Sequence, residues 1–269
     1  IIFPVIEKSQ VRTAMSSVTQ VLSPQAEELQ AKRREMADLR RKLADKELEL
    51  STAKSELHLF ERRYQTVVGP MYAELDQVKA QILGLACKFY PKAENFREEA
   101  ESARERAGEE EHPVTEKPTK EFNPPEILKK LFRRVAKKIH PDLASSATER
   151  ERRHDLMAKL NEAYDQLDEE AIRSILMEWE AEAPFETALE LGEQLVRMVS
   201  QMAQVRKRLN EISDELEDLT LTEMFQLKQN IDSAEREGRD LLQEIADDIE
   251  EKIKNTKTRI RDLAYDFIE

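Results

Sequence analysis

A long heptad repeat constrains the fold of this chain more than any other feature. Such spacing places apolar side chains on one stripe of a helix, and the stripe must be buried against another helix. Lys32 and Lys46 interrupt the second seam of the repeat, so the pattern predicts a coiled coil of imperfect hydrophobicity. The residues of the first seam are Leu29, Met36, Leu43, Leu50, Leu57 and Tyr64.

Gly69-Pro70 interrupts this repeat, and a second apolar stripe runs from Met71 to Phe89. Two interpretations are open. The dipeptide is either the turn of an antiparallel hairpin or the bend of one kinked helix, because the stripe stays nearly in phase across the proline. We prefer the hairpin.

The repeat returns beyond Pro184, with strict four-three spacing from Leu191 to Leu219. A capping box at Thr220 and Glu223 predicts the start of another helix, so a second hairpin is expected. Gly238 lies on the stripe of that helix, where it costs about 1 kcal/mol relative to alanine. It marks either a close helix crossing or a tolerated defect.

Between the two repeats, a charged segment with prolines and few large apolar residues is predicted to be a linker. Three short amphipathic helices follow it, with a His-Pro-Asp turn after the first. The predicted class is all-α: long coiled-coil hairpins flanking a small helical module. The predicted units are an N-terminal coiled-coil arm (1–107), a linker (108–123), the module (124–180) and a C-terminal coiled-coil hairpin (185–269).

Composition excludes several classes of function. The net charge is −13, 37% of residues are charged and only five are glycine, as in long solvent-exposed helices. Cys87 is the only cysteine, so neither an internal disulfide nor a zinc thiol cluster is possible, and no metal or cofactor is expected. No catalytic motif is present, so we do not expect an enzyme.

The apolar stretch Ile1–Ile6 is too short for a membrane span or a signal peptide. A soluble, cytoplasmic protein is therefore expected. A targeting segment upstream stays open, because the sequence does not start with methionine.

The first helix of the module, residues 126–139, has six cations and one acid, Glu126. In an acidic chain this is a concentrated positive face before an exposed turn, and it suits an acidic protein partner. Nucleic acid is not expected, because no other basic stretch or aromatic platform supports it. The cations are Lys129, Lys130, Arg133, Arg134, Lys137 and Lys138.

The segment "ILKKLFRRVAKKIHPDL" followed by "LMAKLNEAYDQL" resembles helix two, the His-Pro-Asp loop and helix three of a J-domain. J-domains are the modules by which cochaperones engage DnaK-type heat-shock ATPases. The resemblance covers roughly residues 125–176. It implies that His140, Pro141 and Asp142 trigger ATP hydrolysis in the partner, while the basic helix docks on its acidic surface. The implied docking residues of that helix are Lys130, Arg133, Arg134, Lys137 and Lys138.

The chain departs from the J-domain pattern in two places. It has no first helix with an aromatic residue and a Leu-Gly pair, and Leu143 stands where a lysine commonly follows the triad. We expect residues 171–179, or an adjacent arm, to cover the module face that a first helix normally protects. That face includes Leu131, Val135 and Met157.

Cysteine repeats and a Gly/Phe-rich segment are also absent, so the chain resembles a specialised J-protein. Stretches such as "FERRYQTVVGPMYAELD" and "AEREGRDLL" are similar to bacterial J-domain proteins with long flanking coiled coils. The resemblance implies a cochaperone whose arms form homo- or hetero-oligomers or choose a partner. The alternative is a coiled-coil scaffold whose J-like module no longer couples to a chaperone, with His140 an ordinary loop histidine.

Overall fold

The computed structural model describes residues 24–89, 98, 101–103, 122–181 and 190–265. These residues form helices and no strand, which confirms the all-α class. No helix in these ranges is both long and apolar enough to cross a membrane. The main elements are α1 (Pro24–Val67), α2 (Gly69–Phe89), α4 (Glu126–Ile139), the 3-10 turn η1 (Pro141–Leu143), α5 (Ala147–Asp165), α6 (Glu169–Ala181), α7 (Leu191–Leu221), α8 (Glu223–Arg236) and α9 (Leu241–Tyr265).

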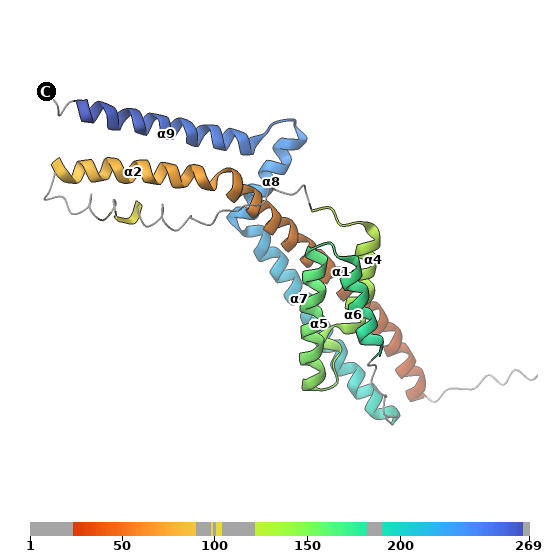
Figure 1. The fold of residues 1–269 in the computed structure, drawn as a ribbon. Helices are drawn as coiled ribbons and strands as arrows, with labels where there is room; N and C mark the ends of the chain where they lie inside the picture. The colour runs from red at the N-terminus through yellow and green to blue at the C-terminus, as the bar shows by residue number, and fades with distance from the viewer. Residues whose placement is uncertain (1–23, 90–97, 99–100, 104–121, 182–189, 266–269) are drawn as a thin grey trace, which may run out of the picture.

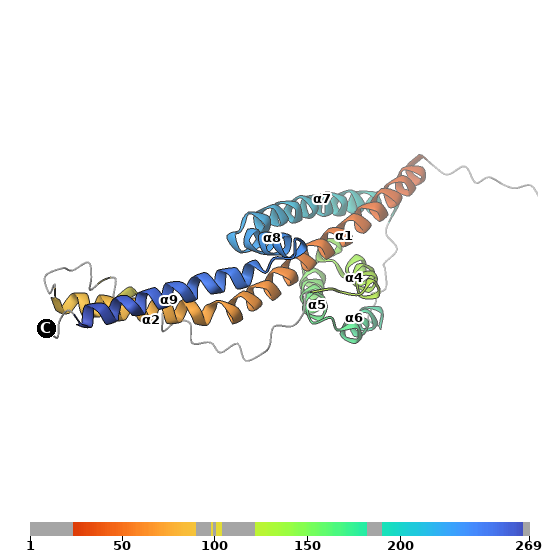
Figure 2. The same ribbon diagram turned by 90° about the horizontal axis from the view of Figure 1, so that it is seen from above.

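Helices α1 and α7 lie side by side and form a two-helix rod (Figures 1 and 2). Side-chain bonds join Arg33 to Gln194, Glu47 to Arg208, and Lys54 to Glu215, each pair 161 residues apart. A constant offset means that the helices run parallel. The seam between them buries Met36, Leu43, Leu50, Met202, Val205 and Ile212.

Helix α2 leaves this rod at an angle and pairs with α9, so that both helices end at the same end of the molecule (Figure 1). Lys257 of α9 forms an ion pair with Glu74 of α2. Helix α8 links the two pairs and contacts α1, where Arg63 Nη2 lies 2.8 Å from Glu235 Oε1. The molecule is therefore a bent rod built from two consecutive helix pairs.

The predicted hairpins are not observed. Helices α1 and α2 are nearly continuous, since Val68 N–H donates to Tyr64 O at 2.8 Å and Tyr72 N–H donates to Val68 O at 3.1 Å. Pro70 is the second residue of α2, where its missing N–H leaves no helical bond unmade. The kinked-helix interpretation holds because the stripe stays in phase, with α1 facing α7 and α2 facing α9.

The turn between α8 and α9 corrects two details of the prediction. Helix α8 begins after Thr222, whose Oγ1 accepts from Phe225 N–H, two residues beyond the predicted cap. Gly238 lies outside the helix with a φ of 80°. Its N–H donates to Glu235 O and that of Arg239 to Ala234 O, a Schellman motif. Gly238 therefore ends α8 and marks neither a crossing nor a defect.

The module consists of α4, α5 and α6 packed around one core, with α1 along one side (Figure 1). Helix α1 contributes Ala44 and Leu48 to this core, and Thr52 Oγ1 lies 3.0 Å from Tyr164 Oη. The expected cover over Leu131, Val135 and Met157 is confirmed, because these residues pack in a core that includes side chains of both α6 and α1.

Candidate functional site

The His-Pro-Asp turn joins two antiparallel helices. Early in α5, Arg153 contacts the end of α4, while the ring of Tyr164 at the end of α5 packs against that of Phe132, with ring centroids 4.9 Å apart. Pro141 disfavours helical backbone at the preceding residue, and α4 ends at Ile139 with His140 at φ −56° and ψ 132°. The sequence therefore fixes where the turn lies.

Four of the five predicted docking cations, all but Arg133, are exposed. Lys130, Arg134 and Lys137 make no ion pair within the described part of the chain. The other two are held by neighbours. Lys138 pairs with Glu180 of α6, and Arg133 Nε lies 2.8 Å from Asp45 Oδ1 of α1, an ion pair without the alignment of a hydrogen bond.

The side chain of His140 is almost fully buried, with 2% of it exposed. Its Nδ1 accepts the Asp142 N–H at 3.1 Å. In the neutral ring the proton is therefore on Nε2, which donates to Glu47 Oε1 at 3.0 Å. The expectation of an exposed turn is wrong for His140, because α1 places an acceptor directly against it.

Glu47 also binds α7, since Arg208 Nε donates to its Oε1 at 3.0 Å. Burial raises the pKa of Glu47, but the bonds from His140 and Arg208 outweigh it and hold the pKa below its ordinary value. Burial likewise lowers the pKa of Arg208, and its bonds to Glu47 and Glu215 more than offset this. The Glu47–Arg208 pair is therefore ionic near neutral pH and ties the turn to both helices of the rod.

Asp142 and Leu143 differ in their surroundings. The side chain of Asp142 is 26% exposed, with Oδ2 3.8 Å from His140 Nδ1. Burial raises the Asp142 pKa, and the positive charge of Arg208 opposes this shift. Leu143 is buried in the α1–α7 seam, and Gln201 Nε2 donates to its carbonyl at 3.0 Å. The leucine at this position thus anchors the turn to the rod.

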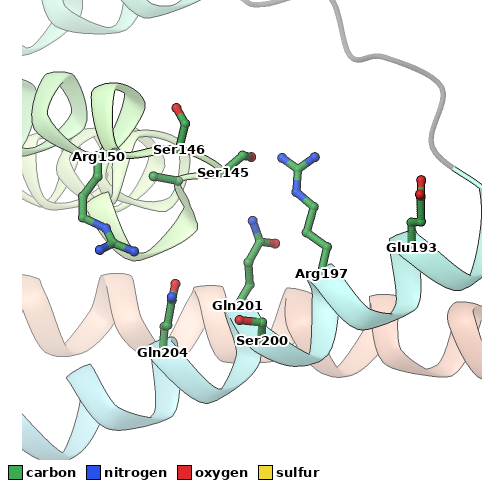
Figure 3. A pocket seen from close by; sticks show the side chains of 10 residues that line it. Ser145, Ser146, Arg150, Glu193, Arg197, Ser200, Gln201 and Gln204 are labelled. Carbon is green, nitrogen blue, oxygen red and sulfur yellow. The ribbon is translucent and has the colours of Figure 1, made fainter.

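Beyond Leu143 the chain leaves α7, and a cleft of about 520 Å³ opens between the start of α5 and α7. Figure 3 shows Ser145 and Arg150 on one side, with Arg197, Gln201 and Gln204 on the other. The contact between the turn and α7 is therefore confined to a short stretch. In the described ranges, no group of His, Cys, Asp and Glu side chains is arranged to hold a metal ion.

Arg153 supports the turn, and we did not single it out from the sequence. Its Nη1 donates to the carbonyls of Lys138 at 2.9 Å and His140 at 3.1 Å, while its guanidinium lies 4.5 Å from the Trp179 ring centroid. It thus satisfies the Lys138 carbonyl at the end of α4, and it adds a second donor to the His140 carbonyl, which already accepts the Leu143 N–H. Its position one turn before Leu156 and Met157, on the apolar stripe of α5, is the sequence signal that could have found it.

Glu47 and Arg208 carry a similar signal. Glu47 lies four residues after Leu43 and three before Leu50, and Arg208 lies three after Val205 and four before Ile212. Opposite charges on the apolar stripes of two helices favour a buried pair.

No family model, curated protein or solved structure matches this chain.

Proposed function

We propose that the chain is a J-domain cochaperone that docks on a DnaK-type ATPase and stimulates its ATP hydrolysis. The observation that carries the proposal is the antiparallel α4–α5 pair with His140-Pro141-Asp142 at its turn. Beside the turn, Lys130, Arg134 and Lys137 stand exposed on the basic helix. The coiled-coil pairs serve assembly or targeting to a partner, and the single reduced cysteine suits the cytoplasm.

The cochaperone itself performs no bond chemistry. Docking shifts the conformational equilibrium of the ATPase toward its hydrolysing state. The size of this shift is limited by the difference in the cochaperone's affinity for the two states of the ATPase. Lys130, Arg134 and Lys137 steer the encounter with an acidic surface. Asp142 then presents its carboxylate, which by the family resemblance meets an arginine of the partner.

The test is the ATPase rate of a purified DnaK-type chaperone with this protein and its variants. Asp142→Asn should abolish most of the stimulation, because a desolvated charge pair at an interface contributes about 2–5 kcal/mol. Its free energy of unfolding should stay within about 0.5 kcal/mol of the wild type. Undiminished stimulation by Asp142→Asn would refute the proposed mechanism.

A second variant reverses the charge of Lys130, Arg134 and Lys137 together. It should slow docking and weaken the dependence of the stimulation on salt. The matched control reverses three exposed cations of α9 and changes the net charge equally. An equal loss of ATPase stimulation in the variant and the control would mean that only the overall charge matters. The control residues are Lys254, Arg259 and Arg261.

A coiled-coil scaffold remains the second candidate, favoured by the burial of His140 against Glu47. In that case the turn is a structural connector between the module and the rod. His140→Ala would then lower stability, and neither the wild type nor any variant would change the ATPase rate.

A further inference from the structure

The turn that we propose as the docking element is closed by the rod. His140 is 2% exposed and Leu143 is 5% exposed. A partner cannot reach a histidine in this state, although Lys130, Arg134 and Lys137 on the same module are open to solvent. The two parts of the docking surface therefore differ in accessibility.

Helices α1 and α7 contribute differently to this closure. Helix α1 belongs to the module, since Leu48 lies in its core and Thr52 contacts Tyr164. Helix α7 reaches the module chiefly through η1. The bond from Gln201 to the carbonyl of Leu143, and the seam in which Leu143 lies, connect the turn to α7.

We infer that α7 is an autoinhibitory helix, which keeps the His-Pro-Asp turn closed until it separates from α1 beside the turn. This inference rests on the proposed function. Separation of α7 frees Leu143 and breaks the Arg208–Glu47 bond, while α1 continues to cover the module core. Glu47 of α1 bonds His140 whether or not α7 is in place, so the contributions of α7 to closure are the Arg208 bond that fixes Glu47 and the cover over Leu143.

Closure has a direct effect on affinity, because the apparent dissociation constant equals the intrinsic one divided by the open fraction. If about one molecule in 100 is open, the wild type binds about 100-fold more weakly than an open variant. Stimulation at a fixed, subsaturating concentration should rise when α7 is loosened.

The opening variant is Met202→Ser/Val205→Ser, which removes two apolar side chains from the seam that buries Leu143. The control is Leu216→Ser/Leu219→Ser, which removes two partly buried leucines from the same helix further along. Neither variant alters the turn, the basic face or the core of the module.

Histidine labelling with diethyl pyrocarbonate measures opening without any chaperone. His58 and His154 are exposed and serve as internal references. In the wild type, His140 should be labelled at least about ten-fold more slowly than His154, because only the open fraction reacts. The opening variant should label His140 faster, whereas the control should keep it protected.

Cross-linking provides the opposite perturbation. In a Cys87→Ser background, Ser145→Cys and Gln204→Cys place thiols on opposite sides of the cleft (Figure 3). A flexible bismaleimide should join them and hold the turn against α7. Stimulation should fall in the linked protein, while the two single-cysteine proteins treated in the same way should keep it.

The outcomes separate the two proposals. Faster labelling of His140 together with greater ATPase stimulation, in the opening variant alone, supports autoinhibition. Faster labelling with stimulation equal to the wild type overturns autoinhibition and leaves the proposed function standing. Faster labelling without stimulation by any form of the protein overturns the proposed function, and the inhibitory role of α7 with it.

Discussion

Glu47→Ala should destabilise the protein more than any single change at an exposed acid of α1. The substitution removes the acceptor of two bonds, from His140 Nε2 and from Arg208 Nε, each 3.0 Å long. A donor left unpaired in a buried site costs about 1–3 kcal/mol, which applies to His140 in full. Arg208 is 25% exposed and keeps Glu215, so its share is about 0–1 kcal/mol.

The expected loss in the free energy of unfolding is therefore about 1–4 kcal/mol. Urea unfolding followed by tryptophan fluorescence measures it in the module, because Trp179 is the only tryptophan. Far-UV circular dichroism follows the rod. Glu49→Ala is the control, since Glu49 is exposed and forms a surface ion pair with Lys46. Its effect should stay within about 0.5 kcal/mol.

The effect of the charge at Glu47 should depend on pH. The pKa of Glu47 is lowered from its ordinary value of 4.5, so the carboxylate stabilises the folded state above that value. This contribution is lost as the pH falls through the lower pKa of the folded state. The difference in stability between the wild type and Glu47→Gln should be full above about pH 5 and shrink on acidification. A difference that is absent at neutral pH, or a Glu47→Ala variant as stable as Glu49→Ala, would refute the reasoning.

Two further substitutions test other parts of the fold. Leu48→Ala should lower the free energy of unfolding by about 2–5 kcal/mol and shift the Trp179 fluorescence transition, because α1 fills the core of the module. Leu167→Ala, at an exposed leucine, is the control. Equal effects of the two substitutions would place α1 outside that core. Gly238→Ala should cost about 1–2 kcal/mol in thermal unfolding, because its φ is 80°. Gly192→Ala, where an added Cβ meets no atom within 4 Å, should be neutral or stabilising, and a neutral Gly238→Ala would contradict the strain at the turn.

The sequence predicted the helices and their buried faces well, because apolar periodicity depends only on local spacing. It did not predict which helices pair. A heptad stripe requires a partner but does not identify it, so the nearest helix in the chain was chosen. The opposite charges of Glu47 and Arg208 on the apolar stripes of α1 and α7 were the available sign that these two helices face each other.

The candidate site was predictable only as a segment. Pro141 fixed the place of the turn through its backbone geometry, and the cations of α4 followed from helical spacing. The burial of His140 was not predictable, because it depends on Glu47, 93 residues away in the chain. Leu143 was the local hint, since an apolar side chain directly after the triad favours a covered turn over an exposed one.

The parallel pairing of α1 with α7 also sets an order of events during synthesis. Each residue of α1 waits for a partner 161 positions later, which is roughly 8–32 s at 5–20 residues per second. Throughout that interval a 44-residue helix displays an unburied apolar seam on the ribosome. A second nascent chain on the same messenger RNA exposes the same seam. Two copies of α1 on neighbouring ribosomes should therefore pair with each other, and this misassembly should become more frequent when the ribosomes are closely spaced.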